Sequence, residues 1–99
     1  MRATAVRKFR VTPTQYALFR FTVAYPTTLY VRLMATAPVN LLLLNKEQRI
    51  DYENGRRTYE VAWGRRSDLE TSVEVDEGTW YFVVEGSTET SSGRIDVFQ

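Results

Sequence analysis

Apolar and polar residues alternate one by one along most of this chain, a period of two that is typical of β-strands with one buried face. The clearest example is LETSVEV at 69–75, in which Leu69 and Val73 point to one side and Glu70 and Glu74 to the other. This pattern predicts eight or nine short strands, at 5–11, 16–24, 28–36, 39–44, 49–53, 57–63, 69–75, 79–85 and 93–98. No window shows the apolar stripe of an amphipathic helix, and Asn45 argues against a helix after the leucine run.

Turn-forming residues separate these runs. Proline marks breaks at Pro13, Pro26 and Pro38, and Asn54-Gly55 is the strongest signal for a β-hairpin turn, with positive φ at Gly55. Short strands at this spacing indicate an all-β fold, a two-layer antiparallel β-sandwich of the jelly-roll type that spans residues 1–99 as a single domain. Within it, alternation predicts that Trp80 and Phe82 belong to the core.

Two segments are apolar on both faces, which a sandwich strand with one wet face does not require. One is Leu41–Leu44 and the other is the segment around Tyr81 and Val83. If they are neighbouring strands, their outward residues form a patch that holds Leu42, Leu44, Tyr81 and Val83, or the complementary set. A second subunit in a C₂ dimer is the cover we expect for it. The alternative is that the N-terminal strand or the loop 86–93 folds over the patch.

The chain contains neither cysteine nor histidine. These absences exclude disulfides, thiolate metal sites and the commonest general base, so we expect no enzyme and no catalytic, cofactor or metal residues. The carboxylate pairs Asp51 with Glu53 and Glu74 with Asp76 would each share a strand face, but alternating acids are the ordinary surface of a sandwich. The acidic turns at 51–55 and 74–78 offer oxygen ligands for calcium without matching the EF-hand spacing.

Charge is distributed unevenly along the chain. Residues 1–46 carry seven Lys or Arg and no acid, whereas residues 47–99 carry six Lys or Arg and twelve acids. We expect these charges to pair across the sheet, because N-terminal strands of a sandwich lie beside C-terminal ones. A net charge of +1 does not favour nucleic acid as a partner. No apolar run approaches membrane-spanning length and no signal peptide is evident, so we expect a cytoplasmic protein without a membrane partner.

The tripeptide Gly-Arg-Arg occurs at 55–57 and again at 64–66. A strand over 57–63 would hold Arg57 and Arg65 roughly 26 Å apart, at about 3.3 Å per residue, so the two pairs are not expected to share one anion. Each pair remains a separate candidate for anion binding. Exposed tyrosines are candidates for stacking on a sugar ring. The candidate binding surface comprises Tyr25, Tyr30, Arg56, Arg57, Arg65, Arg66 and Tyr81.

Two bacterial families share motifs with the last sixty or so residues. The segment from Leu41 to Asn45, followed by Gly78-Thr79-Trp80-Tyr81-Phe82, resembles pre-peptidase C-terminal domains, β-sandwiches appended to secreted enzymes. The order of the segment 52–57, Trp63-Gly64 and 78–81 is similar to a small family of unknown function that is sometimes fused to TIR domains. The chain departs from this second family at Thr79, where that family has histidine. Both resemblances imply a β-sandwich, and neither supplies catalytic residues.

These observations favour a non-catalytic interaction module that acts through a protein partner or through self-association as a homo-oligomer. The alternative is a module that binds carbohydrate or another polymer. A flat apolar sheet face would favour self-association, whereas exposed aromatic residues in a groove would favour the ligand-binding alternative.

Overall fold

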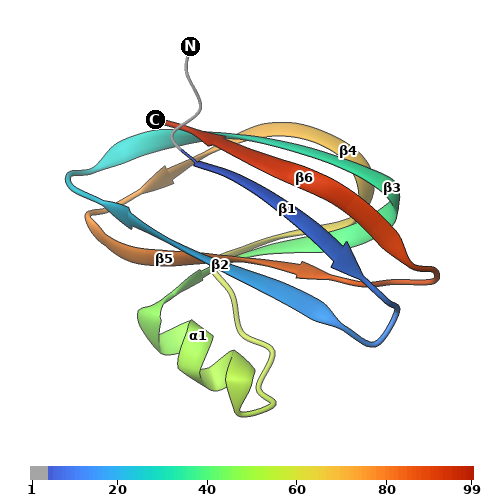
Figure 1. Ribbon diagram of the computed structural model, residues 1–99. Helices are drawn as coiled ribbons and strands as arrows, with labels where there is room; N and C mark the ends of the chain where they lie inside the picture. The colour runs from blue at the N-terminus through green and yellow to red at the C-terminus, as the bar shows by residue number, and fades with distance from the viewer. Residues whose placement is uncertain (1–4) are drawn as a thin grey trace.

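A computed structural model describes residues 5–99, which form antiparallel β-structure with one short helix (Figure 1). Along the chain the elements are β1 (Ala5–Val11), β2 (Tyr16–Val23), β3 (Thr27–Asn45), α1 (Lys46–Glu53), β4 (Val61–Val75), β5 (Gly78–Glu85) and β6 (Ser91–Phe98). Hydrogen bonding orders the strands β1-β6-β3-β5-β2, and β4 pairs with β3.

The sheet folds over on itself because β3 and β4 are long enough to belong to both halves. Residues 30–35 of β3 pair with β6, whereas residues 40–45 pair with β5, and β4 runs beside both parts of β3. We call the half built from β1, β6, β3 and β4 the β1 layer, and the half built from β2, β5, β3 and β4 the β2 layer. The two layers face each other (Figure 1), which confirms the all-β antiparallel sandwich, although the structure has six strands and not eight or nine.

The predicted strands 28–36 and 39–44 are one strand, β3, because the chain bulges at Pro38 without leaving the sheet. The register with β4 shifts between Met34 and Val39 and again between Val39 and Leu41. Proline has no N–H to donate to a ladder, and a bulge is a position that tolerates it. The hydroxyl of buried Ser91 accepts a hydrogen bond from the Ala37 N–H at 3.1 Å and donates one to the Ala37 carbonyl at 2.7 Å. This side chain therefore replaces the ladder contacts that the bulge gives up.

The second long strand, β4, also carries an irregularity. It begins at Val61 and continues without interruption to Val75, so the separate strands predicted at 57–63 and 69–75 are wrong. Arg65 lies in the left-handed region, with φ of 47°, and its N–H donates to the Asn40 side chain of β3 at 2.9 Å. The Asn40 amide thus holds this irregular residue of β4 against β3.

Helix α1 replaces the predicted strand at 49–53. Asn45 accepts a hydrogen bond from the Gln48 N–H at 2.9 Å, and the Gln48 side chain accepts one from the Asn45 N–H at 2.9 Å. This reciprocal capping box satisfies two N–H groups that would otherwise lack partners at the start of the helix. Asn45 therefore starts a helix at the position where we expected it to prevent one.

The predicted hairpin at Asn54-Gly55 is also wrong, because the chain before it is helix α1 and not a strand. Asn54 is the C-cap of α1, and residues 54–60 return to the sheet as irregular chain. Gly55 does have positive φ, at 86°, so that part of the prediction is confirmed. Glycine with positive φ is typical both just after a helix and in hairpin turns, so the dipeptide alone does not separate the two.

The main core lies between the two layers. Phe82 is buried there and stacks on Phe21, with ring centroids 5.1 Å apart. Trp80 packs against this core but is only partly buried, and its indole N–H donates to the Asp76 carbonyl at 2.9 Å. The core prediction is confirmed for Phe82 and holds only in part for Trp80, which packs against the core without being fully buried.

A second, smaller cluster lies on the outer face of the β2 layer, and its buried residues are Leu42, Leu44, Tyr81 and Val83. These are the members of the predicted patch. Their cover is α1, because Tyr52 packs against the cluster and the Arg49 guanidinium lies 5.3 Å from the centre of the Tyr81 ring. The cover within residues 5–99 is therefore α1 and not the N-terminal strand or the loop 86–93, and the exposed apolar patch that led us to expect a dimer here is not present.

No helix within residues 5–99 has the length and apolar character needed to cross a membrane.

Candidate functional site

The candidate site is built around Glu85, the last residue of β5. The sheet register places Tyr16, at the start of β2, on one side of Glu85, and Asn40 of β3 on the other. Side chains of directly paired residues point to the same face, so these three share the outer face of the β2 layer. They lie at the end of the cluster that α1 covers.

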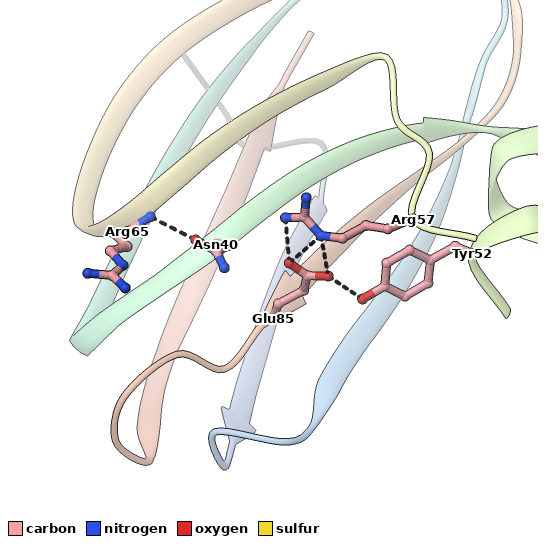
Figure 2. Close-up of polar contacts among 5 residues, drawn as sticks. All are labelled: Asn40, Tyr52, Arg57, Arg65 and Glu85. Atoms are coloured by element: carbon pink, nitrogen blue, oxygen red, sulfur yellow. Dashed lines mark hydrogen bonds and ion pairs between the residues drawn. The ribbon is translucent and has the colours of Figure 1, made fainter. Parts of the chain in front are cut away.

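Helix α1 brings Tyr52 to this row. The Tyr52 hydroxyl donates a 2.6 Å hydrogen bond to Oε2 of Glu85 (Figure 2), and its ring meets the Tyr16 ring edge-on at 5.0 Å and 87°. The capping box at Asn45 sets where the helix begins and therefore where Tyr52 lies. The edge-to-face contact holds the two rings in a fixed relation.

The chain after α1 contributes Arg57. Its Nε donates to both carboxylate oxygens of Glu85, at 3.2 and 3.1 Å, and a terminal nitrogen donates to Oε1 at 2.8 Å (Figure 2). The guanidinium also lies 5.4 Å from the centre of the Tyr59 ring. Because the guanidinium binds both carboxylate oxygens, this pairing fixes the orientation of the Glu85 side chain and also compensates its charge.

Glu85 is an ionised carboxylate that is mostly buried. Its side chain is 15% exposed, whereas that of Arg57 is 49% exposed. Burial by itself would raise the pKa of Glu85, but hydrogen bonds from Arg57 and Tyr52 outweigh it and lower the pKa. Burial, followed by the hydrogen bond to Glu85, raises the pKa of Tyr52. The site therefore holds a neutral phenol and a charged ion pair at neutral pH.

Two adjoining hollows flank these residues and share Tyr16, Tyr52 and Glu85. One, of about 250 Å³, is also lined by Gly55 and Arg57, and the other, of about 270 Å³, by Gly86 and the turn 13–15. Tyr16 is 49% exposed and presents its ring to solvent. We call this region, lined by Tyr16, Tyr52, Arg57 and Glu85, the tyrosine groove.

None of the three tyrosines predicted for a binding surface lines this groove. Tyr25 is 66% exposed in the bend between β2 and β3, and Tyr30 is 48% exposed on the outer face of the β1 layer. Tyr81 is only 6% exposed under α1, so its inclusion in the binding surface is wrong. Tyr81 was predicted to face outward, which it does, but the helix that covers it was not predicted.

The four predicted arginines are all exposed. Arg56 lies 3.9 Å from Asp51, and Arg57 lines the tyrosine groove. Arg65 lies across Asn40 from Arg57, and its side chain points away from it (Figure 2). The distance of roughly 26 Å predicted between Arg57 and Arg65 assumed a strand over 57–63. The structure contains no such strand, because residues 54–60 are irregular and β4 begins at Val61.

Sequence reasoning missed Tyr52 and Glu85 as partners, because they are 33 residues apart and no motif links them. The one local signal available was Asn45 with Gln48, whose spacing predicts a helix start and would have moved Tyr52 from a strand onto a helix. Asp51 and Glu53 also lie on α1, where residues two apart point in different directions, so they are not the paired carboxylates that a strand would present.

Other hollows lie elsewhere on the molecule. One, of about 820 Å³, is lined by Glu60, Glu74, Asp76 and Trp80, and another, of about 470 Å³, lies between Tyr30 and Phe98. Within residues 5–99, no group of three or more acidic side chains is arranged to hold a metal ion.

Comparison with known proteins supports the fold. No protein-family model and no curated protein matches the sequence. Among solved structures, the pre-peptidase C-terminal domain of a collagenase from Bacillus anthracis is similar, with a TM-score of 0.65 and 11% identity over 93% of this chain and 88% of that one. The mitogen of Yersinia pseudotuberculosis is also similar, with a TM-score of 0.60 and 18% identity over 94% of this chain and 82% of that one.

At these identities the likeness is one of fold. It agrees with the resemblance to pre-peptidase C-terminal domains that the sequence motifs indicated. The resemblance to the TIR-associated family stays a prediction.

Proposed function

We propose that this chain is a non-catalytic binding module that holds a carbohydrate chain, or another hydroxyl-rich polymer, in the tyrosine groove. The observation that carries the proposal is the half-exposed Tyr16 ring, braced edge-on by Tyr52 at 5.0 Å beside the Glu85–Arg57 ion pair. Sugar rings present an apolar face of C–H groups and a rim of hydroxyls. A site for them combines an aromatic ring with planar polar side chains, as this groove does.

The polar pair suits hydroxyl groups in particular. A hydroxyl donates one hydrogen bond and accepts others, so it can bridge the Glu85 carboxylate and the N–H groups of Arg57. Because the Arg57 side chain is 49% exposed, it has surface left to offer a ligand after it pairs with Glu85. Both side chains are held in place before any ligand arrives, which reduces the entropy lost on binding.

The distribution of exposed apolar residues supports ligand binding in the groove in preference to a protein partner docked on the outer face of the β2 layer. Helix α1 already covers Leu42, Leu44, Tyr81 and Val83, whereas Tyr16 remains exposed beside a hollow. The fold likeness to a pre-peptidase C-terminal domain is consistent with a non-catalytic accessory role. Each hollow lies near the lower end of the volumes of known ligand sites, so we expect the groove to hold one or two sugar units with weak affinity.

A titration followed by two-dimensional amide NMR tests this proposal. Soluble oligosaccharides of glucose, xylose, mannose and N-acetylglucosamine are added in turn to the ¹⁵N-labelled chain. We expect at least one of them to shift the amide signals of residues 14–17, 55–58 and 85–87, and Tyr16→Ala to weaken binding tenfold or more. Tyr16→Phe keeps the ring and should retain binding.

The matched control is Tyr25→Ala, which removes an exposed tyrosine outside the groove and should leave binding unchanged. Circular dichroism of each variant checks that it is folded. The proposal is wrong if none of the oligosaccharides shifts these signals, or if Tyr16→Ala and Tyr25→Ala bind equally well.

A further inference from the structure

The outer face of the β1 layer carries side chains in cross-strand rows, since paired residues of an antiparallel sheet lie directly opposite each other. One row contains Phe98, Tyr30 and Ser72. The next contains Val6, Asp96, Arg32 and Glu70, and the third contains Lys8, Arg94, Met34 and Asp68. We call these three rows the row face.

Charge on the row face runs from basic to acidic across the strands. Lys8 of β1 and Arg94 of β6 lie towards one edge, whereas Asp68 and Glu70 of β4 lie at the other. Lys8 comes from the basic first part of the sequence, whereas Asp68 and Glu70 come from the acidic second part. Two ion pairs among the described residues lie on this face, Arg32 of β3 with Glu70 of β4 at 3.8 Å and Arg94 with Asp96 within β6 at 3.0 Å. Lys8 has the basic Arg94 as its neighbour across the strands.

The centre of the row face is partly apolar and open to solvent. Tyr30 is 48% exposed, and it lines a hollow of about 470 Å³ with Phe98, Arg32 and Glu70. Because Tyr30 and Phe98 are paired across β3 and β6, both rings stand over the same part of the sheet. In contrast to the outer face of the β2 layer, no helix of residues 5–99 lies over this face (Figure 1).

The order of the residues makes the face complementary to itself. Consider a two-fold axis that lies in the plane between two copies, runs parallel to the strands and passes between β6 and β3. Rotation about this axis reverses the order of the strands and sets each row opposite the same row of the other copy. It places β1 of one copy over β4 of the other, so Lys8 faces Asp68. In the same arrangement Phe98 of one copy enters the hollow beside Tyr30 of the other.

We propose that the row face is an interface between two copies of this chain, related by this two-fold axis. Four strands at about 4.8 Å spacing give a face roughly 19 Å wide, which is small for a stable dimer. Exposed ion pairs contribute orientation and specificity more than affinity. We therefore expect a weak dimer that forms at tens to hundreds of micromolar and weakens as salt is added. The interface lies on the opposite layer from the tyrosine groove, so it is independent of carbohydrate binding.

Sedimentation equilibrium of the wild-type chain up to about 500 µM tests the proposal, together with three charge variants. Lys8→Asp and Asp68→Lys should each raise the dissociation constant at least tenfold, because each appears twice in a symmetric dimer and sets like charges opposite each other. The double variant Lys8→Asp/Asp68→Lys should restore dimerisation, because it exchanges the two charges. The matched control is Arg20→Asp on the outer face of the β2 layer, which should dimerise as the wild type does.

A chain that stays monomeric at 500 µM in low salt overturns the proposal. So does a dimer that both single variants leave intact. Failure of the double variant to recover would show that Lys8 and Asp68 do not face each other, and would overturn the two-fold arrangement. Circular dichroism and unfolding curves establish that every variant used is folded.

Discussion

The Tyr52 hydroxyl donates a 2.6 Å hydrogen bond to Oε2 of Glu85, and so joins α1 to the end of β5 across 33 residues of sequence. The same tyrosine packs on the cluster of Leu42, Leu44, Tyr81 and Val83 and braces the exposed ring of Tyr16. One side chain therefore serves two purposes. It holds the cover on an apolar patch, and it shapes the groove that we propose as a binding site.

Tyr52→Phe removes this hydroxyl and keeps the ring. We expect a loss of about 1–2 kcal/mol in the free energy of unfolding, since the lost hydrogen bond is to a charged group at a partly buried position. Urea unfolding followed by fluorescence measures it. Tyr25→Phe, at a tyrosine that is 66% exposed, is the control and should change stability by less than about 0.5 kcal/mol. Equal effects of the two substitutions would contradict the prediction.

Acid should destabilise the chain through Glu85. Hydrogen bonds from Arg57 and Tyr52 lower its folded-state pKa against the opposing effect of burial, so the unfolded state binds the proton more readily. The stability that this carboxylate contributes is complete above its unfolded-state pKa of about 4.3, and is lost as pH falls through the lower folded-state pKa.

Unfolding midpoints measured from pH 7 to pH 2.5 check this dependence. Glu85→Gln should be less stable than the wild type at pH 7, and the difference should shrink in acid. Glu89→Gln, in the exposed turn between β5 and β6, should follow the wild-type curve. A Glu85→Gln curve parallel to that of the wild type over the whole range would count against the assignment.

Phe82→Ala should be among the most destabilising single substitutions. The ring is 1% exposed and stacks on Phe21, so its removal leaves a cavity and costs about 3–5 kcal/mol. Trp80→Ala should cost less, although tryptophan is the larger residue, because its ring is only partly buried. Thermal or urea unfolding of both variants gives the order, and the reverse order would show that burial in the structure is misassigned.

Asn45→Ala removes the N-cap of α1. The expected cost is about 1 kcal/mol, the usual effect of losing a capping side chain. Because α1 covers Leu42, Leu44, Tyr81 and Val83, a less stable helix should expose this apolar surface more often. The variant should therefore bind the dye ANS, which binds to exposed apolar surface, more strongly than the wild type. Asn54→Ala at the other end of the helix is the control, since Asn54 has φ of −93° and does not occupy the left-handed conformation that favours asparagine. If neither stability nor dye binding separates the two variants, the helix does not act as a cover.

The alternation of apolar and polar residues determined much of this protein. It predicted the all-β class, the positions of most strands and the core residue Phe82. It also predicted that Leu42, Leu44, Tyr81 and Val83, or the complementary set, gather on one face if the two strands are neighbours, because four consecutive leucines and a second apolar run cannot all point inwards. The structure selects the first set. Side-chain direction in a strand alternates strictly, so facing is readable from local sequence.

Tertiary structure decided what covers that face and what gathers beside it. Pro38 looks like a break, but buried Ser91 satisfies the backbone at Ala37 and β3 continues through the bulge. Asn45 and Gln48 have the local spacing of a helix start, but the place of that helix over Leu42, Leu44, Tyr81 and Val83 is decided by packing. That helix carries Tyr52 to Glu85. Contacts between residues so far apart in sequence depend on how the two layers pack against each other. Local propensity describes only neighbouring residues, so it does not predict such contacts.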